Sequence, residues 1–277
     1  MRVAAAQINS TADVGANLAA AERVVRAAAG DGAELVVLPE KWSLLAAADV
    51  LRERAEPLDG PVVSAARSWA RELGIDLLAG SVAERVPGRE LLANTSLLID
   101  PTGDVVASYR KVHMFDVDVG GVAYRESEAE QAGDELVTAS AAGLELGLSV
   151  CYDLRFPELF RILALRGAQA ITVPAAFTAI TGRDHWEVLL RARAIENQLF
   201  VIAAGQFGKA PPHYDSWGHS MIVDPWGRVL DQIADGEGHA IADLDLGELE
   251  SVRERVPSLA NRRPGAYAWP QEVGADG

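Results

Sequence analysis

Three ionisable residues of the chain each follow a segment that is predicted to be a β-strand. Glu40 comes after the apolar run 35–39, Lys111 after the strand predicted at 105–109, and Cys151 after the strand predicted at 144–150. In α/β proteins the strand ends open into crevices where sites form, so the three side chains could converge. A carboxylate, an ammonium group and a thiol could together support nucleophilic catalysis. Taken singly, they have simpler interpretations as a turn carboxylate, a solvated charge and a buried small hydrophobe.

The elements that must position these residues alternate between strands and helices. Short apolar runs such as 34–38 are typical of strands buried on both faces, and a helical period indicates helices between them. We expect strands at 3–8, 34–38, 75–80, 91–99, 105–109, 144–150, 170–173, 200–204, 220–223 and 228–230, and helices at 15–29, 61–73, 155–166, 183–197 and 246–255. This alternation predicts one α/β domain with helices on both sides of mixed sheets.

The composition argues against several classes of protein. The chain of 277 residues is 49% hydrophobic, which is enough for a large buried core. Its net charge of −15 repels phosphates, so we expect neither nucleic acid nor a membrane surface as a partner. No apolar run approaches the roughly 18 residues of a spanning helix, and the N-terminal run is too short for a signal peptide. The single cysteine, Cys151, fits a reducing compartment, so we expect a cytoplasmic protein.

The sequence also lacks the common cofactor and metal motifs. A phosphate-binding loop of the G-x-x-x-x-G-K-[ST] type is absent, and Gly30-Asp31-Gly32 lacks the third glycine of a dinucleotide fingerprint. Neither an H-E-x-x-H motif nor a Cys/His cluster occurs. A papain-like enzyme fits poorly, because its histidine would lie roughly 130–150 residues after the cysteine, beyond His239, the last histidine. We therefore expect no metal and no cofactor.

Five segments resemble the motifs of one family. They are Leu-Pro-Glu at 38–40, Tyr-Arg-Lys-Val-His at 109–113, Cys-Tyr-Asp-Leu-Arg-Phe-Pro-Glu at 151–158, and the longer segments 185–197 and 217–227. In these segments and their order, over nearly the whole chain, the sequence resembles the nitrilase superfamily of carbon–nitrogen hydrolases. Around 151–158 and 185–227 it looks most like the branch of omega-amidases and deaminated-glutathione amidases.

This resemblance implies a fold and an assembly. The fold is a four-layer α-β-β-α sandwich with mixed sheets, formed by a single domain over residues 1–277. The assembly is a homodimer or a higher homo-oligomer that pairs through the helices at 155–166 and 185–197. Residues 257–277 would form a tail that packs on the partner subunit, with Tyr267, Trp269 and Pro270 in it. A disordered tail is the alternative.

The resemblance also implies a catalytic set. Cys151 would be the nucleophile, and Glu40 would take its proton, pass it to the departing ammonia and then activate water. Lys111 and the backbone N–H of Tyr152 would stabilise the oxyanion. Glu126 would position Lys111 or the water; the alternative is a solvated loop carboxylate. Before it, this chain has Val-Gly-Gly at 119–121 where relatives often have Val-Pro-Gly, which loosens the loop.

A substrate carboxylate would be bound by Arg155, four residues after the nucleophile, through two parallel hydrogen bonds. The alternative for Arg155 is an ion pair with Glu158 at a helix start. The resemblance also places a further group in the substrate pocket: Phe177, Thr178, Thr181, His185 and Trp186. Because the protein is acidic, an anionic substrate requires such a local positive anchor.

The predicted function is hydrolysis of the terminal amide of a small carboxylate-bearing compound, with release of ammonia through a Cys151 thioester. Two alternatives use the same triad: an N-carbamoyl amino acid amidohydrolase, which would also release carbon dioxide, and a nitrilase. A non-catalytic scaffold with a vestigial site is the alternative from another class. The reactivity of the thiol would distinguish this scaffold from an enzyme.

Overall fold

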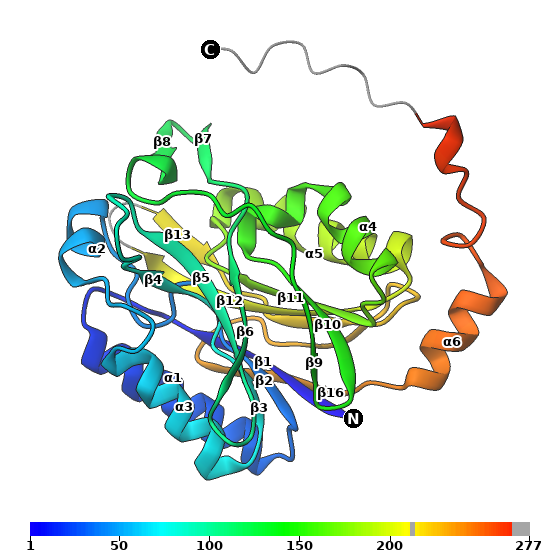
Figure 1. Cartoon of the computed structure of the whole chain (residues 1–277), viewed down its shortest axis with the longest axis horizontal. Coiled ribbons are helices and arrows are strands. Elements are labelled where there is room, and N and C mark those ends of the chain that lie inside the picture. Colours follow the sequence, from blue (N-terminus) through cyan, green and yellow to red (C-terminus); the bar gives the residue numbers. More distant parts are fainter. Residues whose placement is uncertain (211–213, 268–277) are drawn as a thin grey trace.

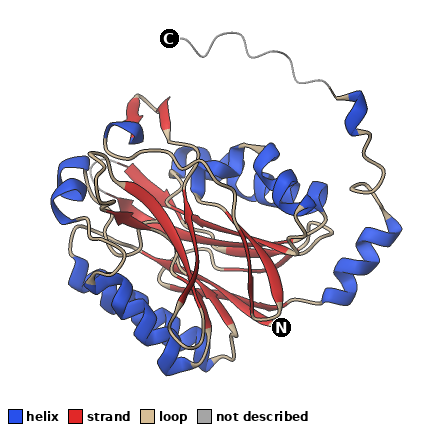
Figure 2. Cartoon of the chain, in the orientation of Figure 1, coloured by secondary structure: helices blue, strands red, loops and turns tan. Residues whose placement is uncertain are grey.

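Helices lie on two opposite sides of a mixed β-sheet in a computed structural model that describes residues 1–210 and 214–267 (Figures 1 and 2). The helices are α1 (Val14–Gly30), α2 (Ala48–Arg54), α3 (Pro61–Leu73), α4 (Pro157–Leu165), α5 (Ala179–Asn197) and α6 (Leu246–Arg255), with short 3-10 helices η1 (Glu126–Glu128), η2 (Cys151–Arg155) and η3 (Pro264–Ala266). Helices α1 and α3 lie side by side on one side of the sheet, and α4 and α5 lie on the other. The predicted α/β fold with helices on both sides is thus confirmed.

The strands of the sheet join the two halves of the chain. They are β1 (Arg2–Ile8), β2 (Leu35–Val37), β3 (Asp76–Leu78), β4 (Val82–Glu84), β5 (Ala93–Ile99), β6 (Val105–Arg110), β9 (Thr138–Ala141), β10 (Leu144–Leu148), β11 (Ala170–Ala175), β12 (Phe200–Ala210), β13 (Tyr214–Trp217), β14 (Met221–Val223), β15 (Val229–Gln232) and β16 (Gly238–Asp243). The main path runs β4-β5-β3-β2-β1-β12-β11-β10-β9. The parallel pairing of β1 with β2 and with β12 makes one continuous sheet from strands of the two halves of the chain.

The core shows why these strands form where they do. Side chains of a strand alternate between its two faces, and in β1 both faces are apolar and buried. Val3 and Ala5 belong to the cluster that includes residues of α4 and α5, whereas Ala4 and Ala6 pack with residues of α1 and α3. The strand ends are therefore rigidly held, and the loops that leave them can position a site.

Two helices begin more than one residue away from their predicted starts. The helix predicted at 155–166 begins only at Pro157, because a proline suits the first helical position and keeps Phe156 before it extended. Residues 151–155 form η2 instead. Helix α5 begins at Ala179, four residues before the predicted start at 183. The strands expected at 91–99 and 105–109 are confirmed as β5 and β6, which pair in antiparallel fashion.

The sequence did not predict every element. Helix α2, strands β4, β9, β13 and β16, and a separate two-stranded sheet of β7 (Asp116–Val119) and β8 (Val122–Arg125) were absent from the expected set. After α6, the described part of the tail extends away from the sheet (Figure 1). Trp269 and Pro270 lie outside the described residues. Within the described ranges, no helix is long and apolar enough to cross a membrane.

Candidate active site

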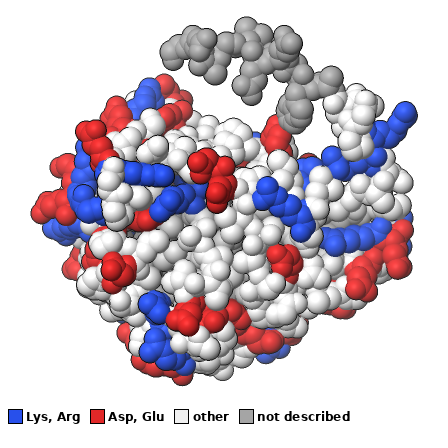
Figure 3. Space-filling model, in the orientation of Figure 1, with Lys and Arg blue, Asp and Glu red and all other residues white. Residues whose placement is uncertain are grey.

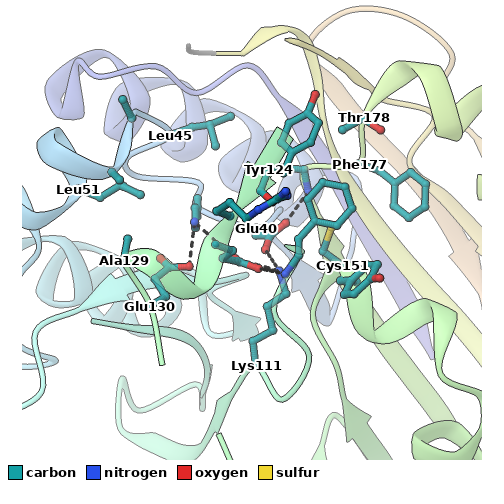
Figure 4. A pocket seen from close by; sticks show the side chains of 18 of the residues that line it. Glu40, Leu45, Leu51, Lys111, Tyr124, Ala129, Glu130, Cys151, Phe177 and Thr178 are labelled. Carbon is teal, nitrogen blue, oxygen red and sulfur yellow. Dashed lines mark hydrogen bonds and ion pairs between the residues drawn. The ribbon is translucent and has the colours of Figure 1, made fainter. Parts of the chain in front are cut away.

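Glu40, Lys111 and Cys151 line one cavity of about 310 Å³, as their shared positions at strand ends predicted. The Nζ atom of Lys111 lies 2.9 Å from Oε1 of Glu40, and all three residues are buried. Figure 4 shows Lys111 pointing at the carboxylate of Glu40 with Cys151 beside them. The structure therefore brings together residues that are separated by strands and helices in the chain.

Glu40 lies in the loop after β2, and two hydrogen bonds hold its carboxylate in place. The Oε2 atom of Glu40 accepts from the backbone N–H of Ala176, just after β11 (2.9 Å), and its Oε1 atom accepts from Nδ2 of Asn94 on β5 (2.9 Å). The loop also passes very close to Gly80, where a Cβ atom would lie 1.9 Å from the carbonyl oxygen of Pro39. With a φ of 37°, Gly80 is a position that only glycine fills easily.

Lys111 follows β6 and is bound by two carboxylates. Besides Glu40, its Nζ atom contacts both oxygens of Glu126, at 3.0 and 2.8 Å. Burial lowers the pKa of Lys111, but the charges of Glu126 and Glu40 outweigh it and hold that pKa well above its usual value. The ammonium group therefore stays charged in the buried site.

Glu126 begins η1 and is enclosed by the protein. Its Oε2 atom accepts a hydrogen bond from the backbone N–H of Phe115 (2.7 Å), and its side chain is 10% exposed. Burial raises the pKa of Glu126, yet the ammonium groups of Lys111 and Lys41 outweigh it, so the net pKa is lowered. A solvated loop carboxylate would show neither this burial nor these contacts.

A tight turn presents Cys151 to the cavity. Its φ of 46° lies in the left-handed region, which is rare for a residue with a side chain. Asp153 holds the turn: its Oδ2 atom accepts from Val150 N–H (2.8 Å) and from Tyr109 Oη (2.7 Å), and its Oδ1 atom lies 2.7 Å from Nδ1 of His113. The backbone N–H of His113 also donates to Oδ1, at 3.2 Å. Together these four contacts to one buried carboxylate can stabilise such a strained backbone.

The surroundings of Cys151 favour the protonated form of its thiol. Burial and then the charge of Glu40 raise its pKa well above the ordinary value, and Lys111 opposes this only in part. The thiol therefore requires a proton acceptor before it can attack, and Glu40 is the adjacent carboxylate.

The backbone around Cys151 also offers a hydrogen-bond donor. Because η2 begins at Cys151, the N–H groups of Cys151 and Tyr152 have no acceptor within the 3-10 helix. Tyr152 lines the cavity together with Cys151. Its N–H directly follows the cysteine in the chain and has no acceptor within the 3-10 helix.

Only some of the residues predicted to bind substrate line the cavity. Arg155, Phe177, Thr178 and Thr181 line the cavity, whereas two others lie outside its lining. His185 is exposed, with Nδ1 3.2 Å from Nη1 of Arg155. Trp186 is buried, packs against Phe177 and donates Nε1–H to the carbonyl oxygen of His219 (2.8 Å).

Arg155 does not form the ion pair with Glu158 that was its alternative. Its guanidinium group lies over the ring of Phe177, with Cζ 4.9 Å from the ring centre, and burial lowers its pKa. Among the described residues, no carboxylate lies within ion-pair distance of Arg155. The cavity therefore contains a partly buried cation with no acidic partner.

Sequence reasoning missed several residues of this site. Asn94 links the two carboxylates, since its Nδ2 atom is 2.9 Å from Glu40 and 3.2 Å from Glu126. Lys41 and Glu130 form a second ion pair in the same cavity, with Nζ 3.0 Å from Oε2. Asn94 could have been recognised from the sequence, because a polar residue within a buried strand requires hydrogen-bond partners. Lys41 and Glu130 could not, because they lie in loops, where charged residues are common.

The charged side chains that are visible on one face of the molecule are mixed in sign (Figure 3). On the face in Figure 3, acidic and basic side chains are interspersed around a broad uncharged area. Across residues 1–210 and 214–267, no group of His, Cys, Asp and Glu side chains could hold a metal ion. The cavity with Cys151 remains the place where nucleophile, base and cation meet.

The sequence and the fold are both similar to those of known carbon–nitrogen hydrolases. The carbon–nitrogen hydrolase family profile matches residues 2–254. The chain is 43% identical to the deaminated glutathione amidase of Synechocystis over 94% of this chain and 97% of that protein, and 36% identical to an omega-amidase of Danio rerio over 96% of each. A solved amidase of the nitrilase superfamily from Nesterenkonia has a TM-score of 0.81 at 29% identity and covers 96% of this chain and 95% of its own.

One structure of the Nesterenkonia amidase bears directly on the cysteine. In a mutant of that enzyme with a glutamine in place of a glutamate, acrylamide has been added covalently to the active site cysteine (TM-score 0.78, 29% identity, 93% of this chain and 98% of that one). The chain belongs to the carbon–nitrogen hydrolase family. Within that family it is a thiol-dependent amidase, similar to deaminated glutathione amidases and omega-amidases, and Cys151 is its active-site cysteine beside Glu40 and Lys111.

Proposed function

We propose that the enzyme hydrolyses the terminal amide of a small carboxylate-bearing compound, with Cys151 as nucleophile and Glu40 as the group that moves protons. Lys111 and the N–H of Tyr152 stabilise the oxyanion, and Glu126 positions Lys111. The contacts of Lys111 to both carboxylates support these roles, because they hold the ammonium group charged beside the sulfur.

The reaction has two halves with a thioester between them. Glu40 takes the proton from Sγ of Cys151 as the sulfur bonds to the amide carbon, and the carbonyl oxygen gains the negative charge. When the carbon–nitrogen bond breaks, the protonated Glu40 gives its proton to the departing nitrogen, which leaves as ammonia. Glu40 then takes a proton from water as its oxygen attacks the thioester, and the thiol of Cys151 leaves with that proton.

The unpaired guanidinium group of Arg155 is the observation that carries the substrate assignment. A partly buried cation with no acidic partner among the described residues is suited to a carboxylate of the substrate, which it could bind through two parallel hydrogen bonds. Phe177, Thr178 and Thr181 line the same part of the site. His185 and Trp186 act from behind it, through contacts to Arg155 and Phe177.

A screen of ammonia release tests this function. The substrates are alpha-ketoglutaramate, alpha-ketosuccinamate, deaminated glutathione, the monoamides of glutarate and succinate, and carbamoyl amino acids. We expect turnover of at least one carboxylate-bearing amide. Release of carbon dioxide together with ammonia would instead identify an N-carbamoyl amino acid amidohydrolase. If the enzyme hydrolyses none of these compounds, the proposal is wrong.

Arg155→Met tests the carboxylate contact. We expect KM to rise about tenfold or more for a carboxylate-bearing amide, because a charged hydrogen-bond pair is lost, and to change little for an uncharged amide such as butyramide. The matched control is Arg183→Met, which removes an exposed guanidinium group on α5. An equal effect of Arg155→Met on both substrates would contradict the assignment.

We also propose that the chain is one domain that forms a homodimer or a higher homo-oligomer in the cytoplasm. Apolar side chains on the outer faces of α4 and α5 support pairing: Ile162, Leu165, Ile180, Val188 and Ile195 are all exposed. Residues 257–277 would pack on the partner, and Tyr267 is 64% exposed in the described part. The catalytic use of a free thiol fits a reducing compartment. Sedimentation of the full chain tests the assembly.

A further inference from the structure

The cavity contains a second buried ion pair that the proposed mechanism does not use. Lys41 and Glu130 lie 3.0 Å apart, Nζ to Oε2, and their side chains are only 11% and 1% exposed. Figure 4 shows Glu130 on the side of Glu40 away from Cys151, with its own ion-pair contact. The chain has three lysines, Lys41, Lys111 and Lys209, and two of them lie in this cavity.

Both members of the pair are fixed next to residues of the mechanism. Lys41 follows Glu40 directly, and Ser81 Oγ accepts its backbone N–H at 3.1 Å. Glu130 is the fourth residue after Glu126 and donates its backbone N–H to the carbonyl oxygen of Glu126 at 3.0 Å. The backbone of each residue is therefore tied to that of Glu40 or Glu126.

Lys41 also contacts Glu126 through its side chain, with Nζ 3.6 Å from Oε1 of Glu126. In the described part of the chain, the buried Oε1 atom of Glu130 has no hydrogen-bond partner. A negative charge is costly on a buried carboxyl group when one of its oxygens has no donor, and protonation removes that cost. Burial raises the pKa of Glu130, Lys41 opposes this and Glu126 adds to it, and the resulting pKa is about 7, whereas the pKa of Glu126 is lowered. Of these two carboxyl groups, Glu130 is therefore the one that takes up a proton as the pH falls through about 7.

The charges of the two lysines and three glutamates in the cavity balance when Glu130 is protonated. The groups that face Glu130 are Lys41 from the loop after β2, Glu126 of η1 and Lys111 from the loop after β6. With Glu130 neutral, the two ammonium groups offset the carboxylates of Glu40 and Glu126. Without Lys41, a single ammonium group would face two carboxylates and a thiol that must become negative, which is costly in a buried site.

We propose that Lys41 and Glu130 are positioning residues of the active site: Glu130 stores the surplus proton of the cluster, and Lys41 supplies the second positive charge. Together they keep Glu126 ionised on Lys111 and lower the cost of negative charge on Cys151. This inference rests on the catalytic roles proposed above for Glu40, Lys111 and Glu126.

The rate at which iodoacetamide alkylates Cys151, measured against pH, tests the proposal. Cys151 is the only cysteine, so every alkylated thiol reports on this site. In Lys41→Met we expect the midpoint of the profile to rise by about one pH unit, which is a roughly tenfold slower reaction at neutral pH. Lys41→Arg, which retains the charge, should restore most of the rate. Lys209→Met is the matched control, because Lys209 is exposed.

Glu130→Gln tests the stored proton. Glutamine keeps the shape and a donor but cannot ionise, so this variant should react several-fold faster than the wild type above pH 7, and the ratio should decrease towards lower pH. Glu128→Gln, an exposed carboxylate in the same turn, is the control. A ratio that does not depend on pH would overturn the assignment of the proton to Glu130.

The double variant Lys41→Met/Glu130→Gln separates this role from a structural one. It removes both members of the Lys41–Glu130 contact and leaves at position 130 a side chain that cannot ionise, so it should fold even if Lys41→Met does not. We expect the double variant to show the same raised midpoint of Cys151 alkylation as Lys41→Met, because the ammonium group of Lys41 is missing from both. A wild-type profile in Lys41→Met or in the double variant would overturn the proposal. Failure of the wild type to hydrolyse any amide would instead overturn the proposed function, since alkylation requires no substrate.

Discussion

The Nζ atom of Lys111 lies 2.9 Å from Oε1 of Glu40, although the two residues are 71 positions apart in the chain. The same ammonium group contacts both oxygens of Glu126 at 3.0 and 2.8 Å. Such a group cannot give up its proton cheaply, because two buried carboxylates would then lose the cation that contacts both of them, and only Lys41, 3.6 Å from Glu126, would remain. Lys111 is therefore a fixed positive charge beside Cys151, suited to stabilise an oxyanion.

Lys111→Met should abolish most of the activity and also destabilise the fold. We expect kcat to decrease by about a thousandfold or more, because catalytic residues act as a unit. The free energy of unfolding should decrease by about 3–5 kcal/mol, since the variant leaves two buried carboxylates without their partner. Urea unfolding and ammonia release measure the two effects. The exposed Lys209→Met should change neither, and a fully active Lys111→Met enzyme would contradict the role of this residue.

Asp153→Asn should weaken the turn that presents Cys151. One oxygen of Asp153 accepts from Val150 and Tyr109 and the other accepts from His113, whereas asparagine has a single acceptor oxygen and can keep the bonds of only one side. We expect a loss of about 2 kcal/mol in stability and a decrease in kcat that exceeds the change in KM, because the left-handed conformation of Cys151 loses its support. Wild-type kcat in Asp153→Asn would show that the turn does not need this carboxylate. Asp184→Asn, at an exposed position on α5, is the control.

The stability of the protein should decrease as pH rises towards 7 because of Glu130. Its pKa is raised in the folded state to about 7, mainly by burial, so the folded protein retains a proton that the unfolded chain releases near pH 4.5. This stabilisation is complete below that lower value and is lost as pH rises through about 7, at no more than about 1.4 kcal/mol per pH unit.

Urea unfolding of the wild type and of Glu130→Gln between pH 4.5 and 8 measures this effect. The variant cannot titrate at this position, so its stability should decrease less over that range. Glu128→Gln should follow the wild type, since Glu128 is exposed. Parallel curves for the wild type and Glu130→Gln would exclude the raised pKa as the cause.

Much of the fold could be predicted from the sequence because its buried strands are short, apolar and clearly bounded. The run Leu35–Val37, for example, is wholly buried as its composition indicated. Errors arose where the local signal was weak or ambiguous. Arg155 was assigned to a helix because the polar segment before Pro157 has no clear boundary, whereas the proline determines where α4 begins.

The site could be predicted only in part for a related reason. Resemblance identified Glu40, Lys111 and Cys151, and the cavity brings all three together with Glu126. The Lys41–Glu130 pair had no such signal, because burial of charged loop residues depends on tertiary packing and not on their sequence neighbours. Glu130 lies near Glu126 and Glu128, and nothing in that acidic run distinguishes the buried members from the exposed one.

Ammonia release by Cys151→Ala is the most direct test of the account, which holds that the reaction passes through a thioester on this sulfur. Circular dichroism and urea unfolding first establish that the variant is folded. We predict no ammonia release above background from any amide that the wild type hydrolyses. Release at the wild-type rate by the folded variant would contradict the assignment of Cys151 as the nucleophile.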